Sequence, residues 1–212
     1  MAATTRSPSG DPATAAPPRP GLRERKKLRT RTAIRRAAFR LIAAHGYEAT
    51  TVEQIAEAAD VSPSTVFRYF PAKEDIVLAD EYDRVMEAVL RARPAAEPPL
   101  ESLGAALTEA FAAMLAQEPE EMRQRSRLIV EVPALRARMT GTMAETALLL
   151  ARAIAERAGR EPDDLDVRVF TAAVMGALRE ALIHWAERDQ QDDLVALVHR
   201  TLDTLRGGLR LQ

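Results

Sequence analysis

The segment from Ser62 to Phe70, SPSTVFRYF, gathers side chains that could form hydrogen bonds to the edges of DNA bases. If the segment is helical, Val66 and Phe70 fall on one face, and Arg68 is the long hydrogen-bond donor on the opposite face. An α-helix fits the DNA major groove, and an arginine there can donate two hydrogen bonds to one guanine. The chemistry predicted for this segment is therefore base recognition.

Two helices joined by a tight turn are predicted to position this segment. Thr50 followed by Glu53 matches a capping box, which predicts the start of the first helix. Asp60 provides the turn residue, because aspartate tolerates a left-handed backbone at some cost. Ser62 predicts the cap of the second helix, with Pro63 at its first position, where a missing N–H does no harm. The pattern is that of a helix-turn-helix.

This pattern resembles the DNA-binding domain of the TetR (tetracycline repressor) family. The residues that match the family's recognition helix and the start of the next helix are Ser62, Thr65, Val66, Phe67, Tyr69, Phe70, Lys73 and Glu74. Upstream, the apolar stripe of a first helix is formed by Ile34, Ala37, Ala38, Leu41 and Ile42, and His45-Gly46-Tyr47 resembles its end. Asp60 and Ala72 depart from the family's usual glycine and its usual Ser or Asn cap. Each departure should lower local stability by roughly 0.5–1 kcal/mol.

The residues that we expect to contact DNA are Thr51, Ser62, Pro63, Ser64, Thr65, Phe67, Arg68, Tyr69, Lys73, Arg29 and Arg31. Arg68 is the candidate for guanine, and Phe67 is the candidate for a thymine methyl group. The family resemblance implies that Tyr69 and Lys73 contact phosphates. The alternative for Phe67 and Tyr69 is packing against a neighbouring helix, because short helices often bury aromatic rings.

Charge is distributed unevenly along a chain whose formal net charge is −1. Residues 1–73 carry 13 Lys or Arg against 6 Asp or Glu, whereas the remainder carries 17 against 25. This asymmetry suits a phosphate-binding module joined to a module that does not bind DNA. The densest basic cluster, which contains Arg29 and Arg31, is predicted either to enter a minor groove as an arm or to stay free in solution.

The fold predicted for the chain is all-α, with about nine helices whose boundaries are marked by prolines and glycines. Residues 1–21 are proline-rich and are expected to form a disordered tail. Residues 22–75 are expected to form the three-helix helix-turn-helix domain, and residues 76–212 a helical bundle for ligand binding and dimerisation. No apolar run reaches the ~20 residues of a membrane span, and the absence of cysteine fits a cytoplasmic protein.

Later helices are expected over residues 73–93, 100–117, 120–132, 141–158, 163–187 and 192–206. The helix over 163–187 has apolar residues on more than one face, so it should pack both within its own bundle and against a second subunit. The family resemblance implies a homodimer through this eighth helix and the ninth, over 192–206, bound to an inverted-repeat operator in double-stranded DNA. Packing within one subunit is the alternative.

An apolar ligand pocket is predicted in the bundle, because flexible methionines suit a cavity that adapts its shape. The candidate lining residues, which ordinary core packing would also explain, are Phe111, Met114, Met122, Leu128, Ile129, Met143, Met175 and Trp185. The segment Ser126–Arg138 resembles a piece of actinobacterial TetR-type regulators, some of which sense acyl-CoA or other lipophilic molecules. The arginines in and just before this segment could bind an anionic group, or they could form a solvated face: Arg123, Arg125, Arg127, Arg136 and Arg138. The small-molecule effector itself is unknown.

Other functions find less support in the sequence. Glu180, His184 and Glu187 could bind a metal from one helix face, but such spacings are common by chance, and no nucleophile motif or phosphate loop accompanies them. A protein that lies on membranes could use the basic cluster. We predict a DNA-binding transcriptional regulator, most often a repressor in this family, without cofactor, metal or catalytic site. An activator or a ligand-independent DNA-binding protein is the alternative.

Overall fold

The computed structural model describes residues 21–79 and 82–210, except for the Arg84 side chain. The tail expected at the N-terminus lies almost entirely outside this range. All regular elements among the described residues are α-helices, so the predicted all-α class is confirmed. They are α1 (Leu22–His45), α2 (Val52–Ala58), α3 (Pro63–Tyr69), α4 (Lys73–Leu78), α5 (Tyr82–Ala92), α6 (Pro99–Gln117), α7 (Pro119–Glu131), α8 (Pro133–Ala158), α9 (Leu165–Glu187) and α10 (Leu194–Arg206).

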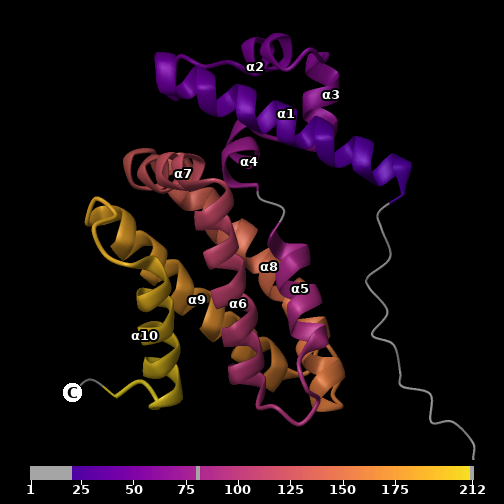
Figure 1. Cartoon of the computed structure of the whole chain (residues 1–212), viewed down its shortest axis with the longest axis vertical. Helices are drawn as coiled ribbons and strands as arrows, with labels where there is room; N and C mark the ends of the chain where they lie inside the picture. Colours follow the sequence, from indigo (N-terminus) through magenta and orange to yellow (C-terminus); the bar gives the residue numbers. More distant parts are fainter. Residues whose placement is uncertain (1–20, 80–81, 211–212) are drawn as a thin grey trace, which may run out of the picture.

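The helices form two groups that meet at α4 and α7 (Figure 1). Helices α1 to α3 lie at one end of the molecule, and α5, α6, α8, α9 and α10 form a bundle at the other. The short helix α4 contacts both α1 and α8, whereas α7 packs on α8 and α9. None of the described helices is long and apolar enough to span a membrane.

Two helix boundaries differ from the sequence-based expectation. The described part of the chain has ten helices, whereas about nine were expected. The helix expected over 73–93 is divided into α4 and α5, because Ala79 leaves the helical region with φ −66° and ψ 135°. The helix expected from Gly141 begins earlier, at Pro133. A proline at the first helical position starts a helix as readily as it ends the preceding one, which explains the second difference.

The cap of α2 also differs from the expectation by one residue. Thr51, and not Thr50, accepts a hydrogen bond from the Gln54 amide at 3.2 Å, and the Gln54 side chain accepts one from the Thr51 amide at 2.9 Å. Thr50 is buried, and its hydroxyl donates to the Gly46 carbonyl at 2.8 Å. Both Thr-Glu and Thr-Gln pairs fit the capping-box pattern, so the sequence alone did not distinguish the two registers.

The buried apolar residues form two clusters. One fills the bundle of α5 to α10 and includes Leu107, Leu150 and Leu178. The other lies under α1 to α4, yet it also contains side chains from the opposite domain: Leu128, Ile129, Leu135, Met139 and Ile183. The helix-turn-helix therefore shares its core with α7, α8 and α9.

Candidate nucleic-acid interface and adjoining cavity

The recognition helix α3 is started by the local signals that the sequence contains. Asp60 in the preceding turn has a left-handed φ of 54°. The Ser62 hydroxyl accepts a hydrogen bond from the Thr65 amide at 3.2 Å, and Pro63 occupies the first turn. Val66 is fully buried, which fixes the side of the helix that faces the core. The remaining faces of this short helix are directed toward solvent.

The outward side of α3 carries the side chains predicted to read DNA. Ser64 and Arg68 are exposed, and Phe67 keeps 48% of its surface in contact with solvent. The packing alternative for Phe67 therefore finds no support here. Tyr69 is half-buried, and the Arg68 guanidinium lies over its ring at 5.3 Å. An exposed phenylalanine beside an exposed arginine is a suitable surface for a groove that presents both thymine methyl groups and hydrogen-bond acceptors.

Lys73 holds the helix-turn-helix to α4. Its ammonium donates to the carbonyls of Tyr47 at 2.9 Å and Thr50 at 3.1 Å, and it lies 4.0 Å from the centre of the Tyr47 ring. The Tyr47 hydroxyl in turn donates to Glu74 at 2.8 Å. Burial and this hydrogen bond raise the pKa of the Tyr47 hydroxyl. Because an ammonium has three N–H donors, these contacts leave one donor for another partner.

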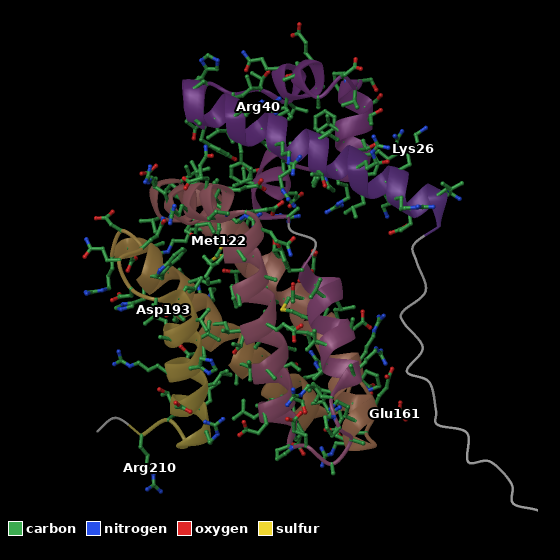
Figure 2. All side chains as sticks on the ribbon, in the orientation of Figure 1. Lys26, Arg40, Met122, Glu161, Asp193 and Arg210 are labelled. Atoms are coloured by element: carbon green, nitrogen blue, oxygen red, sulfur yellow. The ribbon has the colours of Figure 1, made fainter. Side chains whose placement is uncertain are left out.

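The basic cluster near the N-terminus forms the first turns of α1, so the expectation of an arm is wrong for these residues. Figure 2 shows Lys26 at the end of α1 that projects away from the other helices. Arg29 is exposed along this part. Arg31 instead donates to the Tyr69 carbonyl at 3.4 Å and lies 4.7 Å from the Phe70 ring centre. Sequence reasoning did not detect that Arg31 supports the recognition helix from behind.

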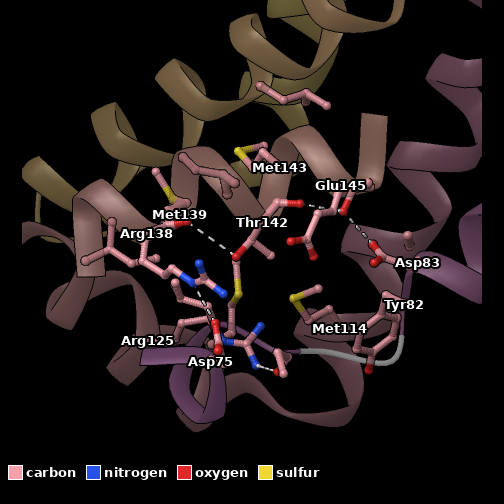
Figure 3. A pocket seen from close by; sticks show the side chains of 18 of the residues that line it. Asp75, Tyr82, Asp83, Met114, Arg125, Arg138, Met139, Thr142, Met143 and Glu145 are labelled. Atoms are coloured by element: carbon pink, nitrogen blue, oxygen red, sulfur yellow. Dashed lines mark hydrogen bonds and ion pairs between the residues drawn. The ribbon is translucent and has the colours of Figure 1, made fainter. Parts of the chain in front are cut away.

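A cavity of about 380 Å³ adjoins the helix-turn-helix (Figure 3). Of the candidate pocket residues, the structure places the following in its wall: Phe111, Met114, Met122, Ile129, Met143 and Met175. Leu128 and Trp185 do not line it. Leu128 packs in the core shared with α1 to α4, and the Trp185 indole donates to the Asp192 carbonyl at 2.8 Å. Methionine dominates the wall, since Met86 and Met139 also contribute.

The wall of this cavity includes parts of both domains. Tyr69 and Phe70 at the end of α3 and Asp75 in α4 line it together with residues of α7, α8 and α9. Arg138 of α8 donates from its Nε to Asp75 at 2.7 Å. At the other end, the Thr146 hydroxyl donates to Asp83 at 3.1 Å. A molecule that fills the cavity would therefore touch the segment that carries the recognition helix.

A second polar connection joins the domains beside the cavity. Arg35 of α1, which is 4% exposed, donates to Glu118 at 2.6 Å and pairs with Glu121 of α7. Arg125, also in the cavity wall, lies 3.7 Å from Glu121 and donates to the Ala79 carbonyl at 3.2 Å. Sequence reasoning missed this network, because no local pattern relates α1 to α7.

The three residues considered for a metal site serve other contacts. Glu180 pairs with Arg179 at 2.6 Å, and Glu187 pairs with Arg136 at 3.3 Å. His184 is exposed. Across the described ranges, no three histidine or acidic side chains gather in an arrangement that could hold a metal ion.

Comparison with known proteins agrees with this geometry. Residues 34–79 match the model of the bacterial regulatory proteins of the tetR family, and residues 97–210 match the MftR C-terminal domain. The HTH-type transcriptional regulator TcmR of Streptomyces glaucescens is 38% identical over 197 residues, which cover 88% of this chain and 87% of that protein. The chain belongs to the TetR family.

Two further comparisons are with a fatty acid metabolism regulator and with a repressor solved in complex with an acyl-CoA. The Bacillus subtilis (strain 168) fatty acid metabolism regulator protein is 26% identical over 181 residues, which cover 82% of this chain and 92% of that protein. Thermus thermophilus FadR, a TetR-family transcriptional repressor solved in complex with lauroyl-CoA, is 25% identical with a TM-score of 0.55. The alignment covers 86% of this chain and 96% of FadR. As a TetR-family member, the protein is a DNA-binding transcriptional regulator, which matches the predicted class of function.

Proposed function

We propose that the protein is a homodimeric repressor that leaves an inverted-repeat operator when a lipophilic small molecule fills the cavity. One observation carries this proposal: Tyr69, Phe70 and Asp75 line the same cavity as the methionines of the bundle. A ligand there contacts the end of the recognition helix and the start of α4 directly. Since two sites that share a mobile element are coupled reciprocally, ligand and operator should weaken each other's binding by the same factor.

The ligand class is inferred from the wall and from two relatives. The wall is mainly apolar, and about 380 Å³ lies at the lower end of the roughly 300–1,000 Å³ typical of small-molecule sites. FadR of Thermus thermophilus was solved with lauroyl-CoA, and the Bacillus subtilis relative is a fatty acid metabolism regulator. A medium-sized acyl-type or other lipophilic effector is supported by these observations.

The DNA contacts are proposed for the exposed side of α3 and the adjoining helix ends. Arg68, Ser64 and Phe67 face the bases, whereas Thr51 and the free donor of Lys73 face phosphates. The exposed basic turns of α1, which include Arg29, extend this surface along the phosphate backbone. The remaining proposed contacts are Ser62, Pro63, Thr65 and Tyr69, whereas Arg31, expected at DNA from the sequence, is proposed to support α3 from behind.

The dimer interface is proposed for α9, with α8 as its neighbour. Leu165 and Val169 on α9 and Leu148 on α8 are large apolar residues that are 58–71% exposed. They border a hollow of about 660 Å³ whose lining is almost entirely apolar. Helix α10, the other helix expected at the interface, packs Leu194, Val198 and Leu202 into its own bundle. The exposed apolar surface therefore favours α8 over α10 as the partner of α9.

The test of this function is selection of bound fragments from random duplex DNA, followed by a salt series on the winning sequence and a scrambled duplex. A selected inverted repeat, bound far more tightly than the scrambled duplex, is the expected result. Binding that depends on salt but not on sequence would reject a specific operator. Reporter expression from a promoter that contains the repeat then separates a repressor from an activator.

The dimer proposal is tested separately by sedimentation. Val169→Asp should convert the dimer to monomer, because it places a charge in the proposed apolar interface. Ala196→Asp on the exposed side of α10 is the matched control and should leave the dimer intact. Disruption by both variants would support an interface of α9 and α10, and a wild-type monomer at micromolar concentration without DNA would reject both interfaces.

A further inference from the structure

Arg138 presents an unused hydrogen-bonding edge at the cavity. Its Nε donates to Asp75, and within residues 21–79 and 82–210 its Nη1 and Nη2 make no hydrogen bond or ion pair. A guanidinium carries five N–H donors, and the two Nη groups can bind both oxygens of a carboxylate side by side. Figure 3 shows the Arg138 side chain directed toward Asp75 at one end of the cavity. This edge is therefore suited to an anionic oxygen group.

Asp75 keeps one of its hydrogen bonds when it loses Arg138. Its second carboxylate oxygen accepts a hydrogen bond from the Ala72 amide at 3.0 Å, at the first turn of α4. A carboxylate at a helix N-terminus is also stabilised by the unpaired amides and the helix dipole. A competing anion could thus displace Asp75 from Arg138 while α4 keeps its own cap.

The charges at the opposite end of the cavity orient such a ligand. Glu145 lies seven residues after Arg138 on α8, about 10 Å along the helix axis, and it has no ion pair or hydrogen bond to a described residue. Asp83 is also at that end, where it accepts from Thr146. Two carboxylates repel an anionic group, whereas the end formed by Arg138 and Arg125 attracts one. The methionines between the two ends suit an apolar body.

We propose that the cavity takes an apolar ligand with one anionic oxygen group, and that this group binds the Nη edge of Arg138 in place of Asp75. The ligand thereby opens the ion pair between α8 and α4. Helix α4 carries Lys73, which contacts the α1–α2 loop through the carbonyls of Tyr47 and Thr50. Loss of the ion pair therefore makes the position of the recognition helix less fixed. This inference rests on the proposed function and names the chemistry of its effector.

Three probes of equal chain length test the charge of the ligand: decanoate, 1-decanol and decylamine, titrated calorimetrically into the full-length protein. Decanoate should bind at least about 10-fold more tightly than decanol, since a hydrogen bond to a charged group is worth more than a neutral one. Decylamine should bind more weakly than decanoate, with its ammonium at the end of the cavity formed by Asp83 and Glu145. Equal affinity for all three, a preference for the amine, or no binding of any probe would overturn the inference.

Variants assign the preference to Arg138. Arg138→Gln should bind decanol as the wild type does but lose the preference for decanoate, and Arg138→Lys should keep only part of it, because lysine lacks the planar fork. Arg136→Gln, on the same helix but exposed and outside the cavity wall, is the matched control and should keep the order of the probes. An unchanged preference in Arg138→Gln, or one abolished only in Arg136→Gln, would contradict the assignment.

Asp75→Asn distinguishes competition from a purely structural role. If Asp75 competes with the ligand, its removal should raise decanoate affinity several-fold while lowering operator affinity. A variant that lowers both affinities would contradict the exchange.

Operator binding without ligand is measured in parallel. If the wild-type protein does not bind the operator, the proposed function is rejected. The order of the three probe affinities would still determine the charge of the ligand.

Discussion

Arg35 of α1 donates a hydrogen bond of 2.6 Å to Glu118, although 83 residues separate them in the sequence. The side chain of Arg35 is 5% exposed, and it also pairs with Glu121. Removing one partner of a buried ion pair typically costs about 3–5 kcal/mol. We expect Arg35→Ala to lower the free energy of unfolding by this amount in urea denaturation. The exposed neighbour Arg36 provides the control, and Arg36→Ala should change stability by less than about 0.5 kcal/mol.

The pH dependence of stability should reflect the burial of Glu121. Burial raises the pKa of Glu121 above its ordinary value of 4.5, against the opposing attraction of Arg35 and Arg125. A raised folded-state pKa means that the folded protein binds the proton more tightly than the unfolded chain. The contribution of Glu121 to stability should therefore be greatest below pH 4.5 and decline as the pH rises through its folded-state pKa.

The measurement is the difference in unfolding free energy between wild type and Glu121→Gln from pH 4 to pH 7. We expect the wild type to lose stability relative to the variant as the pH rises. A difference that grows in favour of the wild type would show that the arginines outweigh burial and lower the pKa of Glu121.

Asp60 should be replaceable by glycine with a gain in stability. Its φ of 54° is in the left-handed region, where a side chain is unfavourable and glycine is not. Asp60→Gly should raise the free energy of unfolding by roughly 0.5–1 kcal/mol. Ala56→Gly, inside α2, should lower it by at least about 1 kcal/mol, because glycine disfavours a helix interior and a buried methyl group is lost. Destabilisation by Asp60→Gly would mean that the carboxylate makes a contribution larger than the backbone strain.

Two helical glycines should respond to alanine in opposite ways. At Gly104 of α6, an added Cβ would lie 2.9 Å from the Leu202 side chain of α10, whereas nothing lies within 4 Å of a Cβ at Gly141 of α8. Gly141→Ala should stabilise the protein by up to about 1 kcal/mol through helix propensity. Gly104→Ala has the same gain in helix propensity, but the added methyl group overpacks the core, which should cost about 1–3 kcal/mol. Thermal unfolding of the pair measures the difference, and equal stabilisation would show that Leu202 moves aside freely.

The DNA contacts should separate into specific and general ones. Arg68→Ala should relax the preference at one base pair of each half-site by about 1–3 kcal/mol, because it removes a donor to a base. Lys73→Ala should weaken binding to all sequences and reduce the salt slope by about one charge. Competition assays with single-base variants of the selected operator measure both. A uniform loss in both variants would place Arg68 on phosphate only.

Local signals predicted the helix-turn-helix well. Ser62, Pro63 and Val66 act within a single helical turn, so their pattern in the sequence specifies how α3 starts and which side it buries. Local signals did not predict which threonine caps α2, because the adjacent pairs Thr50–Glu53 and Thr51–Gln54 fit the capping-box pattern equally well. Burial of Thr50, which depends on α1, decided between them.

Long-range contacts were beyond the sequence patterns. Arg31 lies behind α3, Arg35 reaches α7, and Arg138 reaches α4, and in each case the partner is far along the chain. Arg31 and Arg35, four residues apart on α1, thus contact different parts of the molecule, which composition and spacing do not reveal. Met114, Met122, Met143 and Met175, expected in a pocket because methionine suits an adaptable wall, line the cavity. Leu128 and Trp185 show that apolar character does not separate a cavity from a core.

The core shared by α1 to α4 with Leu128, Ile129, Leu135 and Ile183 limits how this regulator can be recombined. A chimera that joined residues 22–79 to the effector domain of another regulator would leave Ile76 and Val77 facing surfaces shaped for different side chains. Exchange of ligand specificity should succeed only when the faces of α7, α8 and α9 that touch the helix-turn-helix are transferred with it. The unit of modular exchange in this protein is therefore larger than the helix-turn-helix itself.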